Sequence, residues 1–214
     1  MSTTATRPLK TLQAGDRLTS REFLKRWENC PEIKRAELIE GEVFLHAASI
    51  RANYHGGPHA DLICWLRLFA LSHPNVELFV TPTVVIDDEN TFEPDAVMHV
   101  IDETARTFLD EQGFLNGSPE LIAEISASTV SIDLNRKKRV YEQSGVKDYL
   151  VWRTEDAAFD WFTLESGKFV RLEADPSDGL HKSRHFAGLW LDAEAMVKRD
   201  LAKVIQRMST KADS

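Results

Sequence analysis

The stretch from residue 120 to residue 153 constrains the fold most, because it reads as a strand, a helix and a second strand in quick succession. Residues 120–126 have the character of a strand, and a helix begins near Asp133. The helix ends at Gly145, since glycine accepts the positive φ of the first position past a helix at no steric cost. Residues 148–153 then form the next strand. With the helices and strands expected on either side, this order predicts an α/β fold.

Lys137 stands on the apolar side of that helix. At about 100° per residue, it points into the middle of an arc formed by Leu134, Val140 and Tyr141. Its neighbour Lys138 lies at the edge of the arc. A lysine directed at a sheet must either extend to solvent along its methylene groups or meet negative charge there. Position 137 therefore requires acidic partners or a path to solvent.

Two acids upstream could supply that charge, Asp95 after Pro94 and Glu124 in the strand at 120–126. Carboxylate oxygens hold Mg²⁺ or Mn²⁺, which keeps bound water and can present one molecule as a nucleophile. An ammonium group nearby stabilises the negative charge that develops on phosphate oxygens. The triplet is thus compatible with metal-dependent phosphodiester cleavage, although the spacing alone is a weak signal for it. Each member also has an ordinary alternative, namely a turn at Asp95, an ion pair at Glu124 and a solvent-directed Lys137.

Several motifs around these residues follow one another in order. They are the acid strand with Glu124, the turn Ser128-Thr129, an Asp-Leu-x-x-Lys-x-x-x-Tyr helix from Asp133 through Lys137 to Tyr141, and a Gly-Val-x-x-Tyr segment from Gly145 to Tyr149. Upstream stand Glu-Leu-Ile-Glu-Gly-Glu at residues 37–42 and the pair Pro94-Asp95. This ordered set resembles the Uma-two family of restriction-endonuclease-like proteins, a branch of the PD-(D/E)XK nuclease superfamily. The resemblance covers about residues 19–192.

The resemblance implies a restriction-endonuclease-like core of a helix, three strands, a helix and a strand, with an added N-terminal hairpin and C-terminal strands and helix. It also implies a Mg²⁺- or Mn²⁺-dependent endonuclease that acts on DNA. In that function Asp95 and Glu124 bind the metal and the Ile125 carbonyl adds a ligand. Lys137 then steadies the nucleophile or the transition state, and His59 assists.

Ser126 departs from the superfamily pattern. Residues 124 and 126 of a strand share a face, and the general motif would place its lysine at Ser126. Serine cannot supply that charge, so the resemblance implies that the lysine has moved to Lys137 on the following helix. Two other functions stay open: a catalytically inactive nuclease-fold module that acts through partner binding or dimerisation, and a hydrolase of another phosphate ester.

Histidines precede the first long helix. His55 and His59 are four residues apart, which would suit a metal on one helix face, but the intervening Gly56-Gly57-Pro58 argues against a continuous helix. His59 alone shares a face with apolar residues of that helix. It reads either as a site residue or as a capping or core histidine.

The remaining elements follow from local patterns. A capping box at Thr19 and Glu22 predicts a short helix. We expect a hairpin over 36–47, a helix over 58–71, strands over 76–86 and 91–101, a polar connection over 102–119, a strand over 159–164 and an amphipathic helix over 192–208. Together they predict a single domain over residues 11–208, with tails at 1–10 and 209–214.

Composition narrows the function classes. The net charge of −8 argues against broad, charge-driven binding of nucleic acid, although a homodimer could gather its basic residues along one groove. Cys30 and Cys64 are too few for a disulfide framework or a zinc site. A signal sequence and an apolar stretch of the roughly 18 residues that a membrane span needs are both missing. We therefore expect a cytoplasmic protein without membrane contacts.

Overall fold

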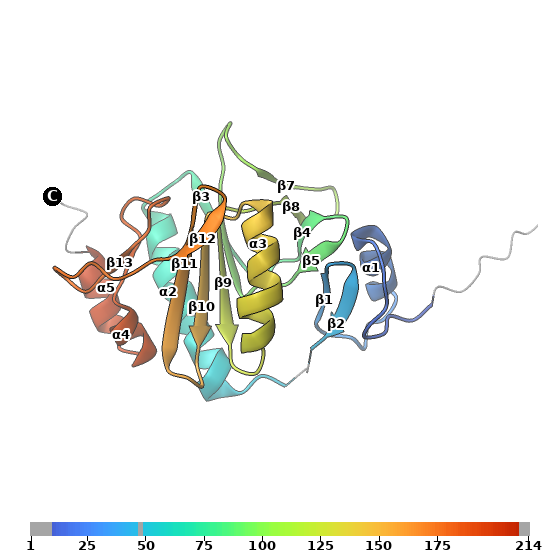
Figure 1. Ribbon diagram of the computed structural model, residues 1–214, viewed down its shortest axis with the longest axis horizontal. Coiled ribbons are helices and arrows are strands. Elements are labelled where there is room, and N and C mark those ends of the chain that lie inside the picture. Colours follow the sequence, from blue (N-terminus) through green and yellow to red (C-terminus); the bar gives the residue numbers. More distant parts are fainter. Residues whose placement is uncertain (1–9, 47–48, 210–214) are drawn as a thin grey trace, which may run out of the picture.

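Two six-stranded sheets organise the protein in the computed structural model, which describes residues 10–46 and 49–209 (Figure 1). The first sheet has the order β2 (Glu42–Leu45), β1 (Ala36–Ile39), β5 (Asn90–Phe92), β4 (Val84–Asp87), β8 (Leu115–Gly117), β7 (Thr107–Leu109). The second has the order β12 (Lys168–Arg171), β11 (Ala158–Glu165), β10 (Asp148–Arg153), β9 (Leu121–Ser126), β6 (Ala96–Val100), β3 (Val76–Val80). A small ribbon pairs β13 (His181–Lys182) with β14 (Trp190–Leu191).

The helices are α1 (Ser20–Trp27), α2 (Gly57–Leu71), α3 (Lys138–Ser144), α4 (Ala193–Val197) and α5 (Leu201–Ser209). A π-helical turn, η1 (Ala52–Gly56), leads into α2, and a second, η2 (Ile132–Lys137), leads into α3. The capping box is confirmed, since the Thr19 hydroxyl accepts a hydrogen bond from the Glu22 N–H at 3.3 Å. Gly145 ends α3 with a φ of 85°, as expected for the residue past a helix.

The restriction-endonuclease-like core is confirmed as α2, β3, β6, β9, α3 and β10 in chain order. Strands β3, β6 and β9 are antiparallel neighbours, and β10 runs parallel to β9 after the α3 crossover. The added hairpin β1–β2 and the added C-terminal elements are present as expected.

The central strand β9 separates two apolar layers because its side chains alternate between the faces of the sheet. Ala123 and Ile125 pack in the layer that contains α2, together with α4 and α5. Ile122 packs in the layer that contains Val140 and Tyr141 of α3. Figure 1 shows α2 and α3 on opposite faces of this sheet. Glu124, one strand position from Ala123 and Ile125, is therefore turned toward the helix that carries Lys137.

Ion pairs hold the β1–β2 hairpin against η2 and α3. Arg136 contacts Glu40 at 3.3 Å and Glu42 at 3.1 Å, and Arg139 contacts Glu40 at 2.6 Å. The Arg136 guanidinium also lies 4.8 Å from the centre of the Phe44 ring. These contacts place β1 of the first sheet next to the buried Lys137 side chain.

The strands predicted over 76–86 and 91–101 are each divided in two, and the prediction of continuous strands is wrong. β3 and β6 belong to the second sheet, whereas β4 and β5 belong to the first. The breaks fall at Thr81, whose φ is 49°, and at the prolines Pro82 and Pro94. Proline cannot donate a ladder hydrogen bond, so the chain leaves one sheet there and enters the other.

Two further predictions of local structure are wrong. The connection over 102–119 contains β7 and β8. Each of these strands has only three residues, which is too short for a clear alternation of apolar and polar side chains. The helix over 192–208 is interrupted between α4 and α5, where Arg199 has a φ of 59° and the Asp200 carboxylate accepts a hydrogen bond from the Lys203 N–H. The helical spacing of apolar residues continues from α4 into α5. The sequence pattern therefore did not reveal that a new helix begins after Asp200.

The predicted tails lie almost wholly outside the described residues, which leave out 1–9 and 210–214. Of their described members, Lys10 has no regular structure and Ser209 ends α5.

Candidate functional site

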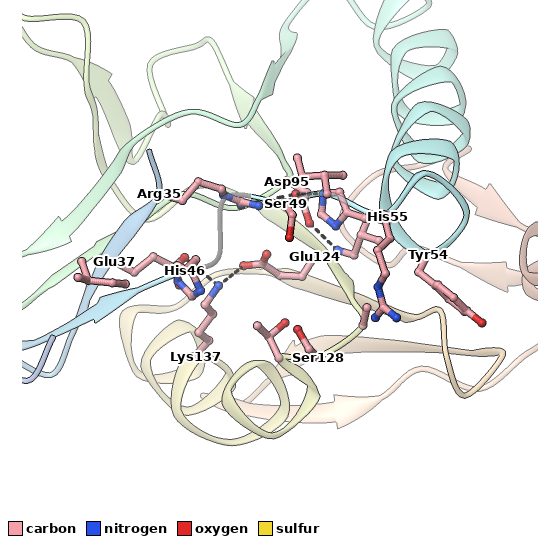
Figure 2. A pocket seen from close by; sticks show the side chains of 16 residues that line it. Arg35, Glu37, His46, Ser49, Tyr54, His55, Asp95, Glu124, Ser128 and Lys137 are labelled. Carbon is pink, nitrogen blue, oxygen red and sulfur yellow. Dashed lines mark hydrogen bonds and ion pairs between the residues drawn. The ribbon is translucent and has the colours of Figure 1, made fainter. Parts of the chain in front are cut away.

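A polar pocket of about 220 Å³ lies where the two sheets meet. Its walls come from the β1–β2 hairpin, the η1 turn before α2, the end of β9 and the η2 turn before α3. Figure 2 shows Lys137 at one end, Tyr54 at the other, and Asp95 and Glu124 between them. Ile125 also lines this pocket. Of the predicted site residues, Asp95, Glu124, Ile125 and Lys137 are thus brought together.

Lys137 lies at the centre of an acidic cluster. Its ammonium nitrogen is 2.8 Å from Glu37 Oε1, 3.1 Å from Glu124 Oε1 and 3.3 Å from Asp133 Oδ1. Burial opposes the lysine charge, but the charges of Glu124, Glu37 and Asp133 outweigh it and raise the pKa of Lys137 well above its usual value. The side chain is 5% exposed, so it is an ion-paired lysine inside the protein rather than one that extends to solvent.

The position of Lys138 confirms the prediction that the two adjacent lysines point in different directions. The Lys138 ammonium group lies 3.8 Å from the centre of the Phe162 ring, on the flank of α3 and outside the acidic cluster. The adjacent lysines therefore have different surroundings although they carry the same charge.

Glu124 accepts hydrogen bonds at Oε1 from Lys137 and, at 3.4 Å, from the Tyr141 hydroxyl. Burial raises the pKa of Glu124 well above its usual value despite the charge of Lys137, and the negative charges of Asp133 and Asp95 add to the effect. A carboxylate that is hard to ionise inside a group of acids gains from any further cation brought into the pocket.

Asp95 lies just before β6 and is 2% exposed. Its Oδ2 accepts a 2.7 Å hydrogen bond from the Ile125 N–H of β9. Burial opposes ionisation, but contact with His55, the Ile125 N–H and the charge of Arg35 together lower the pKa of Asp95. Asp95 Oδ1 receives no hydrogen bond from the described residues, although His55 Nε2 lies 3.2 Å away and Arg35 Nη2 lies 3.8 Å away.

The two histidines flank Asp95, and the expectation of a break between them is wrong. The backbone stays helical from η1 into α2, with Gly56 in the right-handed helical region and Pro58 in the first turn, where its missing N–H costs nothing. His55 faces the Asp95 carboxylate inside the pocket, whereas His59 Nε2 lies 3.0 Å from the Asp95 main-chain oxygen. His59 thus contacts the backbone of Asp95, and His55 is the histidine nearer the acids.

Sequence reasoning missed Glu37. It lies on β1, contacts Lys137, and is also 2.8 Å from His46 Nε2. Burial alone would raise the pKa of Glu37, but the charge of Lys137 and the contact with His46 lower it to about 2. The available signal was an acid between apolar residues of a predicted strand, the same signal that marked Glu124.

Asp133 was expected only at the start of the helix, yet it is 2% exposed and belongs to the cluster. Its Oδ2 accepts hydrogen bonds from the Ser126 hydroxyl at 2.7 Å and the Thr129 hydroxyl at 2.6 Å. Ser126, where the superfamily motif would place its lysine, therefore positions an acid that contacts Lys137. Ser126 and Lys137 thus contact the same Asp133 carboxylate.

The described part of the chain contains no group of three or more His, Cys, Asp or Glu side chains arranged as a preformed metal site. Within the same residues, no helix is both long and apolar enough to cross a membrane.

Comparison with known proteins relates the chain to a protein family and to a solved structure. Residues 21–194 match a family model described as "Uma2: Putative restriction endonuclease". A solved structure, a "putative nuclease belonging to DUF820" from Anabaena variabilis ATCC 29413, is similar with a TM-score of 0.54 and 13% identity; the match covers 81% of this chain and 98% of that one. At this identity the structure supports the fold alone. No curated protein matches. Since the family model spans most of the sequence, the chain belongs to the Uma2 family.

Proposed function

We propose that the protein is a metal-dependent endonuclease that hydrolyses DNA phosphodiester bonds. The observation that carries this proposal is the placement of Lys137 against Glu124 and Glu37 in a pocket that Asp95 also lines. Membership in a family described as restriction endonucleases supports DNA as the substrate.

The donor set suits a hard divalent ion. Mg²⁺ in phosphate-processing sites is typically bound through one or two carboxylates and keeps several waters, so a preformed cage of three side chains is not required. Asp95 Oδ1 is buried, and its nearest partner among the described residues is the His55 ring, with Nε2 at 3.2 Å. Four buried acids, Glu37, Asp95, Glu124 and Asp133, surround this region. A cation would therefore relieve an excess of negative charge.

In this proposal Asp95 and Glu124 hold Mg²⁺ or Mn²⁺. The Ile125 carbonyl is a further ligand candidate, because the N–H and C=O of one strand residue point toward the same neighbour and the Ile125 N–H meets Asp95. When bound, the ion supplies an activated water and neutralises charge on the phosphate.

Side chains of the protein would stabilise charge on the phosphate and hold the metal ligands in position. Lys137 provides a fixed positive charge for the developing negative charge on phosphate oxygens. Glu37 and Asp133 hold the Lys137 side chain from two sides and keep it protonated. His59 contacts the Asp95 main chain and so positions the metal-binding carboxylate.

Cleavage assays with matched glutamate variants test the proposal. Supercoiled plasmid, single-stranded DNA and RNA are incubated with Mg²⁺ or Mn²⁺, and separately with a chelator. We expect DNA cleavage that needs the metal and that Glu124→Gln lowers by about a hundredfold or more, because the variant loses a ligand of the ion that stabilises the transition state. Glu173→Gln, which changes an exposed glutamate, should cleave normally.

Failure of the folded natural protein to cleave any of these substrates with either metal would contradict the proposal. It would favour an inactive nuclease-fold module. Circular dichroism on the same samples establishes that the protein is folded.

A further inference from the structure

We propose that the site acts on an unpaired DNA strand, one base of which stacks on Arg51 and Tyr54 at the mouth of the pocket. This inference rests on the endonuclease function proposed above and names the form of its substrate.

The acids lie at the bottom of a recess. Asp95 is 2% exposed and Glu124 is 4% exposed, and the pocket above them measures about 220 Å³. That space admits a phosphate and its sugar but not two paired strands. A duplex is stiff on this length scale and resists the sharp bend needed to push one phosphate inward. A single strand can bend into the recess.

Arg51 and Tyr54 form a stack at the mouth. The Arg51 guanidinium lies 4.7 Å from the centre of the Tyr54 ring. Both residues are tied to the turn between β10 and β11: the Thr154 hydroxyl donates to the Tyr54 carbonyl at 2.6 Å, and Arg51 pairs with Glu155. The Tyr54 main chain and the Arg51 guanidinium are thereby both tied to this turn. Nucleic-acid bases stack on aromatic rings and on guanidinium planes with little regard to sequence.

The stack is placed so that a strand bound to it reaches the acids. In Figure 2, Tyr54 lies at the end of the pocket opposite Lys137, and Asp95 and Glu124 lie between the two. A strand that runs from Tyr54 to Lys137 therefore passes its backbone over both carboxylates. Ile50, which is 57% exposed at the same mouth, adds an apolar surface beside the stack.

Charge argues against a duplex. Binding of duplex DNA draws mainly on Lys and Arg contacts to phosphates. Of the arginines that line this pocket, Arg51 is paired with Glu155 and Arg35 lies 3.8 Å from Asp95. Arg136 and Arg139, close by, are paired with hairpin acids. The chain as a whole carries a charge of −8. Stacking, which does not need a basic face, is the interaction that this surface offers.

Fluorescence anisotropy tests the inference with a short labelled single strand and a duplex of the same sequence. Glu124→Gln protein is used so that the strands stay intact. Tyr54→Ala in this background should weaken single-strand binding by about tenfold, as expected for the loss of one base stack. Tyr54→Phe, which keeps the ring, should bind within about twofold of the parent. Duplex binding should be weaker throughout and insensitive to both changes.

Cleavage of the same two DNAs by the natural protein with Mn²⁺ completes the test. Faster cutting of the single strand supports the inference. Equal cutting of the duplex, or unchanged single-strand binding by Tyr54→Ala, overturns it while the endonuclease function stands. Folded protein that cuts neither DNA but binds the single strand through Tyr54 would contradict the endonuclease function. The same result would support single-strand binding at Arg51 and Tyr54.

Discussion

Lys137→Ala should lower DNA cleavage by about a hundred- to a thousandfold, the usual effect of removing one group that stabilises a developing oxyanion. Lys138→Ala should retain nearly full activity. The two lysines are adjacent and equally charged, so a long-range electrostatic effect would change both variants alike. Only Lys137 contacts Glu124 and Glu37, whereas Lys138 lies over Phe162.

Initial rates at saturating metal check this expectation, with circular dichroism to establish that each variant is folded at the assay temperature. Lys138→Ala should lose only the modest stability of one cation–π contact, about 0.5–1 kcal/mol. Equal loss of activity in both folded variants would contradict a specific role for Lys137.

Lys137→Met should lower the free energy of unfolding by about 3–5 kcal/mol at pH 8, because it removes the cation from a buried group of acids. Glu37, Glu124 and Asp133 would then share no buried positive partner at 2.8–3.3 Å. The loss should shrink as the pH falls toward 5, since uncompensated buried carboxylates have raised pKa values and become neutral by taking up protons.

In the natural protein, the contribution of Glu37 to stability should change in the opposite direction at acid pH. The pKa of Glu37 is lowered to about 2 in the folded state, below its usual 4.5. Its contribution to stability is therefore fully present above about pH 4.5 and is lost as the pH falls toward 2. Urea denaturation from about pH 2 to pH 8 measures both curves, because the Glu37 contribution changes only below about pH 4.5, with Lys138→Met as the matched control. A Lys137→Met variant as stable as the natural protein at pH 8 would mean that the lysine charge does not stabilise the acidic cluster.

The contact between Lys137 and Glu124, one part of the site predicted from the sequence, is encoded locally. Lys137 is 13 residues from Glu124, and one strand, one turn and one helix determine their relative placement. Helical periodicity was enough to separate Lys137 from Lys138. The order of core elements followed in the same way, from the apolar character of each segment.

The contacts that the sequence did not reveal are those between distant segments. Glu37 meets Lys137 because the β1–β2 hairpin docks on η2 through Arg136 and on α3 through Arg139, and no local pattern encodes that docking. The predicted strands over 76–86 and 91–101 are likewise divided, at Pro82 and Pro94, because their halves pair with strands of two different sheets. His55 was misjudged because glycine and proline were treated as breaks, although both fit the first turn of a helix.

The most direct measurement is anomalous diffraction from crystals of the protein soaked in Mn²⁺, with Glu124→Gln crystals treated in the same way. The proposed function predicts a Mn²⁺ peak within coordination distance of carboxylate oxygens of both Asp95 and Glu124, and a much weaker peak or none in the variant. A well-occupied Mn²⁺ elsewhere with no peak between these two acids, or a peak of equal height in Glu124→Gln, would contradict their assignment as metal ligands.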